Sequence, residues 1–199
     1  MSFAKPTRKE LSRHEAGHAY SYAAVCRYET PDELGLGRDE AGNVYGWCSR
    51  TTLLRPEAKK LDAYDAEMQE LLRWQATAEA VIALAGPLAE FRHRERSRDV
   101  AAMLLFTNAE RILAGEVLRD DSDFRRIRHS FDYIAPADPL AAFRRLLDVT
   151  DEIVHANWTG IGRLGADLEK AAILDDDALD EHFTKRPAVL CRLEGRFLG

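Results

Sequence analysis

The spacing of hydrophobic and polar residues is helical along most of the chain, and the first helix is the best defined. Thr7 and Glu10 have the spacing of a capping box, and apolar residues recur beyond them until about Cys26. Gly17, in the middle of this segment, costs about 1 kcal/mol relative to alanine, so we expect a close neighbour there. The pattern predicts one buried helix from Thr7 to about Cys26.

A single segment has the character of β-structure. Residues Asp32 to Gly37 and Val44 to Ser49 flank the turn-forming sequence RDEAGN. This arrangement predicts a short hairpin, which we expect to lie beside the first helix.

The rest of the chain is predicted to be helical. Pro56 fits the first turn of a helix that continues to Leu84, and Gly86 with Pro87 should end or kink it. Further helices are expected over Asp99 to Glu116, Asp123 to Phe131, Asp138 through Trp158 and beyond, and Asp175 to Phe183. We predict a mainly α-helical single domain over residues 1–199, packed around Leu84, Leu104, Leu146 and Ile153.

Composition and charge narrow the function classes. The chain has 199 residues, of which 46% are hydrophobic, enough for the core of one domain. Its net charge of 28 − 34 = −6 argues against a dedicated nucleic-acid binder, and we interpret the basic run Arg92 to Arg98 as a solvated helix end or loop. No apolar run approaches the roughly 20 residues that cross a bilayer, and the N-terminus lacks a signal peptide's apolar stretch. We expect a cytoplasmic protein without membrane contact.

The three cysteines give no sign of chemistry. Cys26, Cys48 and Cys191 are odd in number and widely spaced, without a CxxC pair. We expect them to be small buried hydrophobes rather than disulfide partners or zinc ligands.

The sequence HEAGH at residues 14–18 carries the candidate chemistry. Histidines four apart on a helix lie on one face about 5 to 6 Å from each other, so both imidazoles can reach one metal ion. Glu15 lies one position round the helix, where its carboxylate can deprotonate a water whose pKa a catalytic zinc lowers toward about 7. His14, Glu15 and His18 thus predict a zinc-dependent hydrolase. The alternative is two core or surface histidines.

A catalytic zinc usually has three protein ligands, so a third donor is expected elsewhere in the chain. The spacing of residues alone does not select it. The candidates are Glu79, Glu90, His93, Asp99, Glu110, Asp120, Asp121 and Asp123.

Four segments resemble the peptidase domain of FtsH-type zinc metalloproteases and occur in the order seen in that family. They are HEAGHA at 14–19, a β segment with VYGW at 44–47, ALAGPLAE at 83–90 and DSDF at 121–124. The region from Ile153 to Leu179 is similar to the family's long final helix, acidic turn and short terminal helix. The resemblance spans most of the chain and implies a helical zincin-like fold with a zinc cofactor.

Residue by residue, this resemblance implies roles for the candidate site. His14 and His18 become zinc ligands, Glu15 the general base and Asp123 the third ligand. Glu90 becomes a candidate to accept a ligand histidine's free N–H and fix its tautomer. The alternatives are a carboxylate placed at a helix N-terminus for Asp123 and a solvent-facing helix residue for Glu90.

The strand around Gly46 and Trp47 has a substrate-binding role by the same resemblance. In these peptidases an edge strand near the zinc pairs with an extended substrate, and a glycine lets the two backbones approach. Alternatively, Gly46 is a bulge and Trp47 a core anchor. The expected substrate is a peptide or an unfolded protein.

The chain also departs from the family pattern. It has no GxxxxGK[ST] phosphate loop and no membrane anchor, so we expect ATP-independent activity, with a separate ATPase or adaptor as an unidentified partner. Pro87 replaces the family's usual arginine, and the helix from Asp99 to Glu116 resembles an insertion. The alternatives to Asp123 as third ligand are Asp120, Asp121 and Glu90.

The sequence therefore predicts a zinc metalloendopeptidase in which Glu15 activates the attacking water. The main alternative is a noncatalytic binding or regulatory module that keeps the peptidase fold with a structural or vestigial zinc site. A zinc hydrolase that acts on a non-peptide amide is a third hypothesis.

Overall fold

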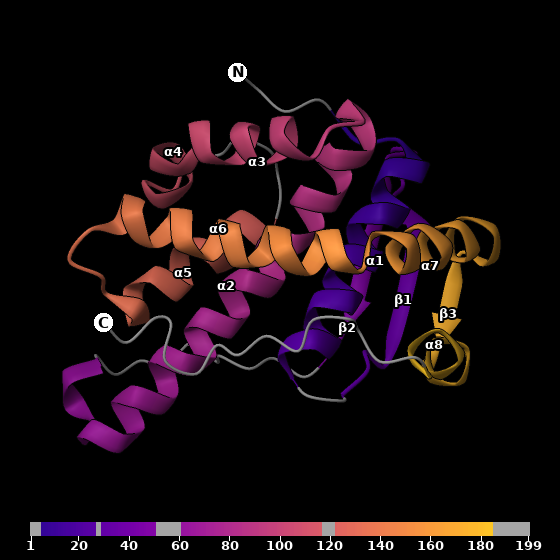
Figure 1. Ribbon diagram of the computed structural model, residues 1–199. Coiled ribbons are helices and arrows are strands. Elements are labelled where there is room, and N and C mark those ends of the chain that lie inside the picture. Colours follow the sequence, from indigo (N-terminus) through magenta and orange to yellow (C-terminus); the bar gives the residue numbers. More distant parts are fainter. Residues whose placement is uncertain (1–4, 27–28, 51–60, 117–121, 185–199) are drawn as a thin grey trace.

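The fold is mainly helical with a small antiparallel sheet, as the sequence pattern predicts (Figure 1). The structure is a computed structural model and describes residues 5–26, 29–50, 61–116 and 122–184. The elements are α1 (Arg8–Val25), β1 (Glu33–Arg38), β2 (Val44–Ser49), a 3-10 turn η1 (Leu61–Ala63), α2 (Ala66–Glu95), α3 (Arg98–Thr107), α4 (Ala109–Leu113), α5 (Ser122–Ile134), α6 (Pro139–Ala156), α7 (Trp158–Ala171), β3 (Ile173–Asp175) and α8 (Asp176–Phe183). Within these residues, no helix has both the length and the apolar character to span a bilayer.

Helix α1 begins with the predicted capping box. The Thr7 hydroxyl accepts a hydrogen bond from the Glu10 N–H at 3.2 Å, and the Thr7 N–H donates to the Glu10 carboxylate at 2.7 Å. Two backbone donors that a helix start leaves unpaired are thereby satisfied. Nearly every residue of α1 from Leu11 onward is buried, so this helix lies in the middle of the molecule.

Close packing between α1 and α2 explains Gly17. A Cβ added at position 17 would lie 2.6 Å from the Ala85 carbonyl oxygen and 2.8 Å from Ala89 Cβ. Alanines make up much of the facing part of α2, so the two helices can approach closely along their length. The close neighbour predicted from the sequence is the backbone of α2.

Replacing Gly17 by alanine is expected to destabilise the protein by about 1–3 kcal/mol, because the clash is with backbone and cannot be relieved by a rotamer change. Gly162→Ala is a matched control, since it is also in a helix and a Cβ there would meet nothing within 4 Å. It should be neutral or stabilising by up to about 1 kcal/mol. Urea unfolding measures both, and equal stabilities would contradict the packing argument.

The prediction for Gly86 and Pro87 was that they end or kink the helix; α2 continues through both, so they do not end it. The helix begins after Asp65, whose carboxylate accepts from the Met68 N–H at 2.9 Å; the predicted start at Pro56 lies outside the described residues. Pro87 has no N–H to donate to the preceding turn. The segment around it is wholly buried, and this packing outweighs the local preference.

Two predicted long helices are each divided at an asparagine. The segment from Asp99 to Glu116 forms α3 and α4, which meet at Asn108, and the helix that begins after Asp138 ends at Asn157, where α7 follows. In both cases the side-chain amide donates to the carbonyl four residues earlier, at 2.8 Å for Asn108 and 2.9 Å for Asn157. Side-chain hydrogen bonds of this kind compete with the helical backbone pattern.

The hairpin forms as predicted and gains a third strand. The strand order is β2–β1–β3, all antiparallel, so β2 has a neighbour on only one side within the described residues. Leu34 and Leu36 of β1 are buried toward the helices. Strand β3 was not predicted, because three residues are too few to show an alternating pattern.

The core includes three of the four predicted residues. Leu84, Leu146 and Ile153 are buried within one hydrophobic cluster. Leu104 is only partly buried, and its neighbour Leu105 is fully buried instead. The buried face of α3 therefore differs by one residue from the predicted one.

The basic run at the end of α2 is a helix end, as interpreted, but its arginines have specific partners. The Arg92 guanidinium lies 4.2 Å from the centre of the Trp158 ring, and Arg98 Nε donates to the Asp151 carboxylate at 2.6 Å. Arg96 ends the helix in a left-handed conformation. The Arg92 contact joins α2 to α7, and the Arg98 contact joins α3 to α6.

Cys26 and Cys48 are free thiols, partly buried against the core. Burial raises the pKa of the Cys26 thiol to about 12 and also raises that of Cys48. Neither is thus a reactive thiolate near neutral pH. Cys191 lies outside the described residues.

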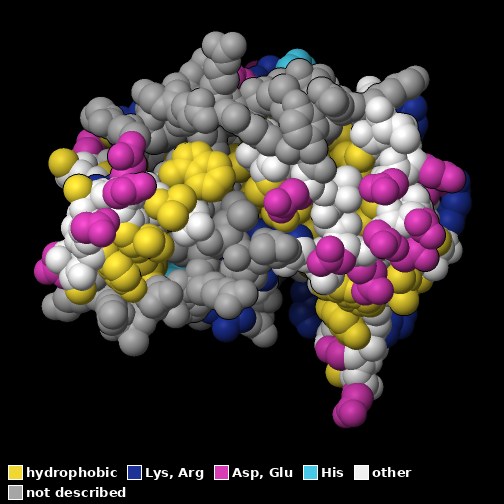
Figure 2. All heavy atoms as spheres, turned by 90° about the horizontal axis from the view of Figure 1, so that it is seen from below, with side chains coloured by type: hydrophobic (Ala, Val, Ile, Leu, Met, Phe, Trp, Pro, Cys, Tyr) yellow, Lys and Arg dark blue, Asp and Glu magenta, His cyan; other side chains and the backbone are white. Residues whose placement is uncertain are grey.

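Acidic side chains are most numerous on one side of the face drawn in Figure 2, the side where Figure 1 places α7 and α8. The exposed acidic residues of α8 are Asp176, Asp177, Asp180 and Glu181. A surface of this charge disfavours contacts with phosphate groups.

Candidate metal centre

Helix α1 presents the two histidines of HEAGH to the same side. The centres of the His14 and His18 rings are 4.7 Å apart, with the ring planes at 79° to each other. Both side chains are buried, as is Glu15 between them in sequence. One turn of a capped, core-packed helix therefore fixes both imidazoles.

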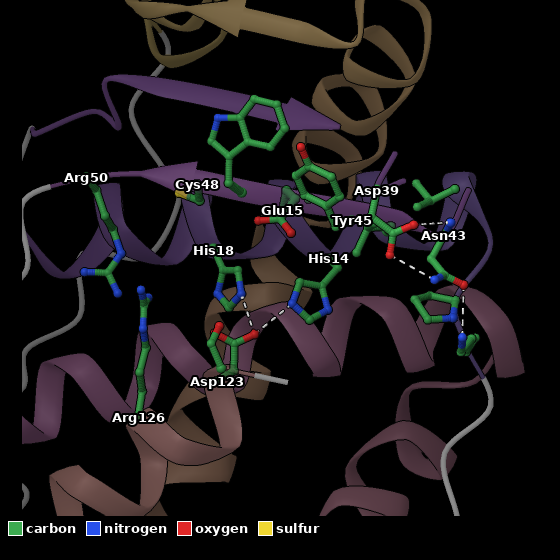
Figure 3. Close-up of a pocket in the computed structure, with 17 residues that line it drawn as sticks. His14, Glu15, His18, Asp39, Asn43, Tyr45, Cys48, Arg50, Asp123 and Arg126 are labelled. Atoms are coloured by element: carbon green, nitrogen blue, oxygen red, sulfur yellow. Dashed lines mark hydrogen bonds and ion pairs between the residues drawn. The ribbon is translucent and has the colours of Figure 1, made fainter. Parts of the chain in front are cut away.

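Asp123, in the first turn of α5, completes the group (Figure 3). One of its oxygens lies 2.9 Å from His14 Nε2 and 3.0 Å from His18 Nε2. The potential ligand atoms of the three residues all lie within 4.8 Å of one another. His14, His18 and Asp123 thus form a buried group that could hold a metal ion.

The other candidate third ligands do not join this group. Among the described residues they are Glu79, Glu90, His93, Asp99 and Glu110, and none belongs to the cluster of potential ligand atoms. Asp120 and Asp121 lie outside the described residues.

The second nitrogen of each histidine has its own partner. His14 Nδ1 donates to Glu90 Oε2 at 3.0 Å, and His18 Nδ1 donates to the Ile82 carbonyl at 2.7 Å. A carbonyl only accepts, so His18 Nδ1 carries a proton. Both Nε2 atoms are thereby directed at Asp123, in the arrangement that outer partners impose on metal-binding histidines.

The charges in this group suit a cation. Burial disfavours a charged His14, but its hydrogen bonds to Asp123 and Glu90 outweigh burial and raise its pKa well above the ordinary value. Burial likewise opposes ionisation of Asp123, yet the attraction of His18 and the hydrogen bonds of both histidines lower its pKa. A buried, ionised carboxylate that faces two imidazole nitrogens is a favourable place for a divalent ion.

Gly86 of α2 lies directly behind the two imidazoles. A Cβ at this position would overlap His18 Nε2 and lie 2.7 Å from His14 Cδ2. Any larger residue would displace the rings from Asp123. The sequence marks this glycine only as a helix breaker, and its contact with the site was not predicted.

A chain of charged hydrogen bonds supports His14 from behind. Glu90 is completely buried, and its second oxygen accepts from Arg94 Nη2 at 2.7 Å. Arg94 Nε also donates to Glu10 at 2.9 Å, the acidic residue of the capping box. Arg94 compensates the buried charge of Glu90, so the carboxylate can stay ionised and hold His14. Arg94 was not predicted, because only the fold brings it to Glu10.

Replacing Arg94 by glutamine is expected to weaken the binding of a divalent metal ion to this group by about 10-fold, because Glu90, the partner of His14, would lose its own partner. The cause is a Glu90 carboxylate left buried without its cation. Arg92→Gln is the matched control. Arg92 is two residues before Arg94 on the same helix, but it stacks on Trp158 and not on the site. Competition with a chromophoric chelator measures both affinities, and equal affinities would show that Arg94 does not act on the site.

Glu15 lies under strand β2. A Cβ on Gly46 would overlap the Glu15 carboxylate, with its Cγ at 2.8 Å, so the strand passes directly over this side chain. Figure 3 shows Glu15 between the strand and the two histidines. The absence of a side chain at Gly46 lets the backbone of β2 reach the metal centre.

A cleft of about 620 Å³ opens along this strand. Its walls are α1, β2 and the start of α5, and the lining residues include His14, Glu15, His18 and Asp123. The cleft thus lies between α1 and β2, beside the strand that the resemblance makes the substrate-binding one.

Trp47 has its side chain on the other face of the sheet. Successive strand residues point to opposite faces, and Gly46 faces Glu15. The indole covers Gly35 of β1, and its Nε1 donates to Glu33 at 2.6 Å. Trp47 therefore packs on β1, and residue 47 still borders the cleft.

No protein-family model matches the chain, and no curated protein matches its sequence. The resemblance to FtsH-type peptidases therefore rests on the segments of the sequence described above.

One end of the cleft is basic. Arg50, just after β2, makes two hydrogen bonds to Glu79 of α2, at 2.7 and 3.1 Å. Burial acts to lower the pKa of Arg50, but the hydrogen bonds and the charge of Glu79 outweigh burial, so the pKa is raised. Arg126 of α5 approaches Glu79 at 3.8 Å, and both arginines line the cleft. Glu79, a candidate third ligand by sequence, is instead the partner of an arginine.

Proposed function

We propose that this protein is an ATP-independent zinc metallopeptidase with a site like that of FtsH-type peptidases. The observation that carries the proposal is the convergence of His14 Nε2 and His18 Nε2 on one Asp123 oxygen, beside Glu15 and at the floor of an open cleft. Two imidazoles with a carboxylate form a donor set typical of catalytic zinc.

The zinc would be held by His14, His18 and Asp123. When bound, it supplies Lewis acidity that polarises a carbonyl and makes a water molecule more acidic. Glu90 and the Ile82 carbonyl keep each ligand histidine in the tautomer that leaves Nε2 for the ion.

Glu15 is the proposed general base. Its carboxylate takes a proton from the water that attacks the peptide carbonyl and delivers that proton to the leaving nitrogen. Burial under Gly46 holds the carboxylate in one place and limits its access to bulk water. A structural metal site would have no use for a carboxylate in this position.

The substrate is proposed to lie along β2. This strand has a neighbour on only one side within the described residues, so its other edge can pair with an extended peptide. Main-chain pairing makes few demands on sequence, which suits peptides and unfolded segments. Folded proteins would have to be delivered unfolded by a separate ATPase or adaptor.

Metal content and peptide cleavage, measured with and without a chelator, test the proposal. The purified protein should contain zinc and cleave an unfolded substrate such as casein, lose activity on chelation, and recover it when zinc is added back. Bound zinc without cleavage of any peptide would favour a noncatalytic module instead. Cleavage that survives complete removal of metal would reject the proposal.

A further inference from the structure

The basic end of the cleft has more positive than negative charge. Two guanidinium groups, of Arg50 and Arg126, face the single carboxylate of Glu79. Arg50 engages both Glu79 oxygens, and its side chain and that of Glu79 are almost completely buried. The Arg50–Glu79 pair is therefore neutral as a unit. The positive charge of Arg126 is not balanced by this pair.

Arg126 is placed to meet a ligand. Its side chain is 46% exposed, it lines the cleft, and Glu79 at 3.8 Å is its only ion-pair partner among the described residues. That separation is too long for a hydrogen bond. Figure 3 shows Arg50 and Arg126 extending toward one another from opposite walls, on the His18 side of the metal centre.

At the other end of the cleft, the described residues pair their charges with one another. There the Asp39 carboxylate accepts from the backbone and side-chain nitrogens of Asn43, at 2.8 and 2.9 Å. Lys5 donates to the Asn43 side chain at 3.0 Å. These polar groups satisfy one another, so the excess charge is confined to the end with Arg126.

Arg126 and the proposed metal ligand Asp123 lie on the same helix. Arg126 is three residues after Asp123 on α5, so both residues lie on one face of the helix. A substrate that passes over His18 along β2 would next meet the Arg126 guanidinium. In a chain of net charge −6, this local positive charge selects among substrates.

We propose that Arg126 is a specificity-determining residue that binds a carboxylate of the peptide substrate, borne either on an acidic side chain or on the C-terminus. This inference rests on the proposed peptidase function. The planar guanidinium offers two parallel donors to a carboxylate, and the buried Arg50–Glu79 pair holds the adjacent wall in place.

Peptide binding to zinc-loaded Glu15→Gln protein tests the proposal without cleavage. In the first set of fluorescein-labelled decapeptides, a single glutamate is moved along the sequence, and each peptide is compared with one that has glutamine at the same position. In the second set, a peptide with a free C-terminus is compared with the same peptide as its C-terminal amide. We expect the acidic member of at least one pair to bind about 5-fold more tightly at low salt, as for a half-exposed ion pair. The preferred set identifies the source of the carboxylate.

The same measurements are made on Glu15→Gln protein that also carries Arg126→Gln or Arg125→Gln. Arg125→Gln is the control, because it removes an equal charge from an exposed neighbour that is not among the residues lining the cleft. The preference should vanish in the first and remain in the second. Absence of any acidic preference, or a preference that persists in Arg126→Gln, would overturn the proposal. Failure of wild-type protein to cleave these peptides, with the Arg126-dependent preference intact, would reject only the peptidase function.

Discussion

Replacement of Glu15 by glutamine is expected to lower kcat for peptide cleavage by about 10²- to 10⁴-fold, the usual contribution of a general base. Glutamine has nearly the same shape and fits under Gly46, but it cannot take up a proton. None of the three metal-binding residues is changed, so zinc should remain bound. A fluorogenic peptide assay measures kcat, and elemental analysis of the same samples measures zinc.

Glu70→Gln is the control for Glu15→Gln, because it removes an equal charge from an exposed position at the start of α2. It should cleave at the wild-type rate. A Glu15→Gln enzyme that keeps full activity would remove Glu15 from the mechanism, whereas loss of zinc in that variant would show that its effect is structural.

Replacement of Asp123 by asparagine is expected to weaken zinc binding by about 100-fold or more. Loss of an outer partner alone commonly costs 10- to 100-fold, and a ligand that contacts the ion should cost at least the upper value. The neutral amide also removes the only carboxylate in the group of potential ligands. Equilibrium competition with a chelator of known affinity gives the change directly.

Asp120→Asn and Asp121→Asn are the matched controls for Asp123, since the sequence leaves all three as possible ligands. Both should keep the wild-type affinity for zinc. If one of them loses zinc and Asp123→Asn does not, the third ligand has been assigned to the wrong aspartate.

The start of α1 and the hairpin could be predicted from the sequence, because both depend on interactions between residues close together in the chain. The capping box at Thr7 defines the start of α1, and the turn sequence between β1 and β2 defines the hairpin. The spacing of His14 and His18 follows from helix geometry alone. Asp123 was reached through resemblance, because nothing in its own surroundings distinguishes it from nearby acidic residues.

Features that depend on tertiary contacts could not be predicted in this way. Pro87 predicts an interruption, yet burial on all sides keeps α2 continuous. Asn108 and Asn157 divide helices through side-chain hydrogen bonds that a hydrophobic pattern does not record. Arg94 lies 84 residues from Glu10 in the chain, so only the folded structure connects it to the helix start and to His14.

The packing of α1 and α5, which carry the proposed metal ligands, bears on whether folding needs the ion. Helices α1 and α2 cross at the centre of the hydrophobic core, and α5 packs on α2, so apolar contacts hold all three ligands in place. Small zinc domains, by contrast, stay unfolded until the metal arrives. In the proposed peptidase the chain would fold first and take up its ion afterwards, so the supply of zinc would control the activity of molecules that are already folded.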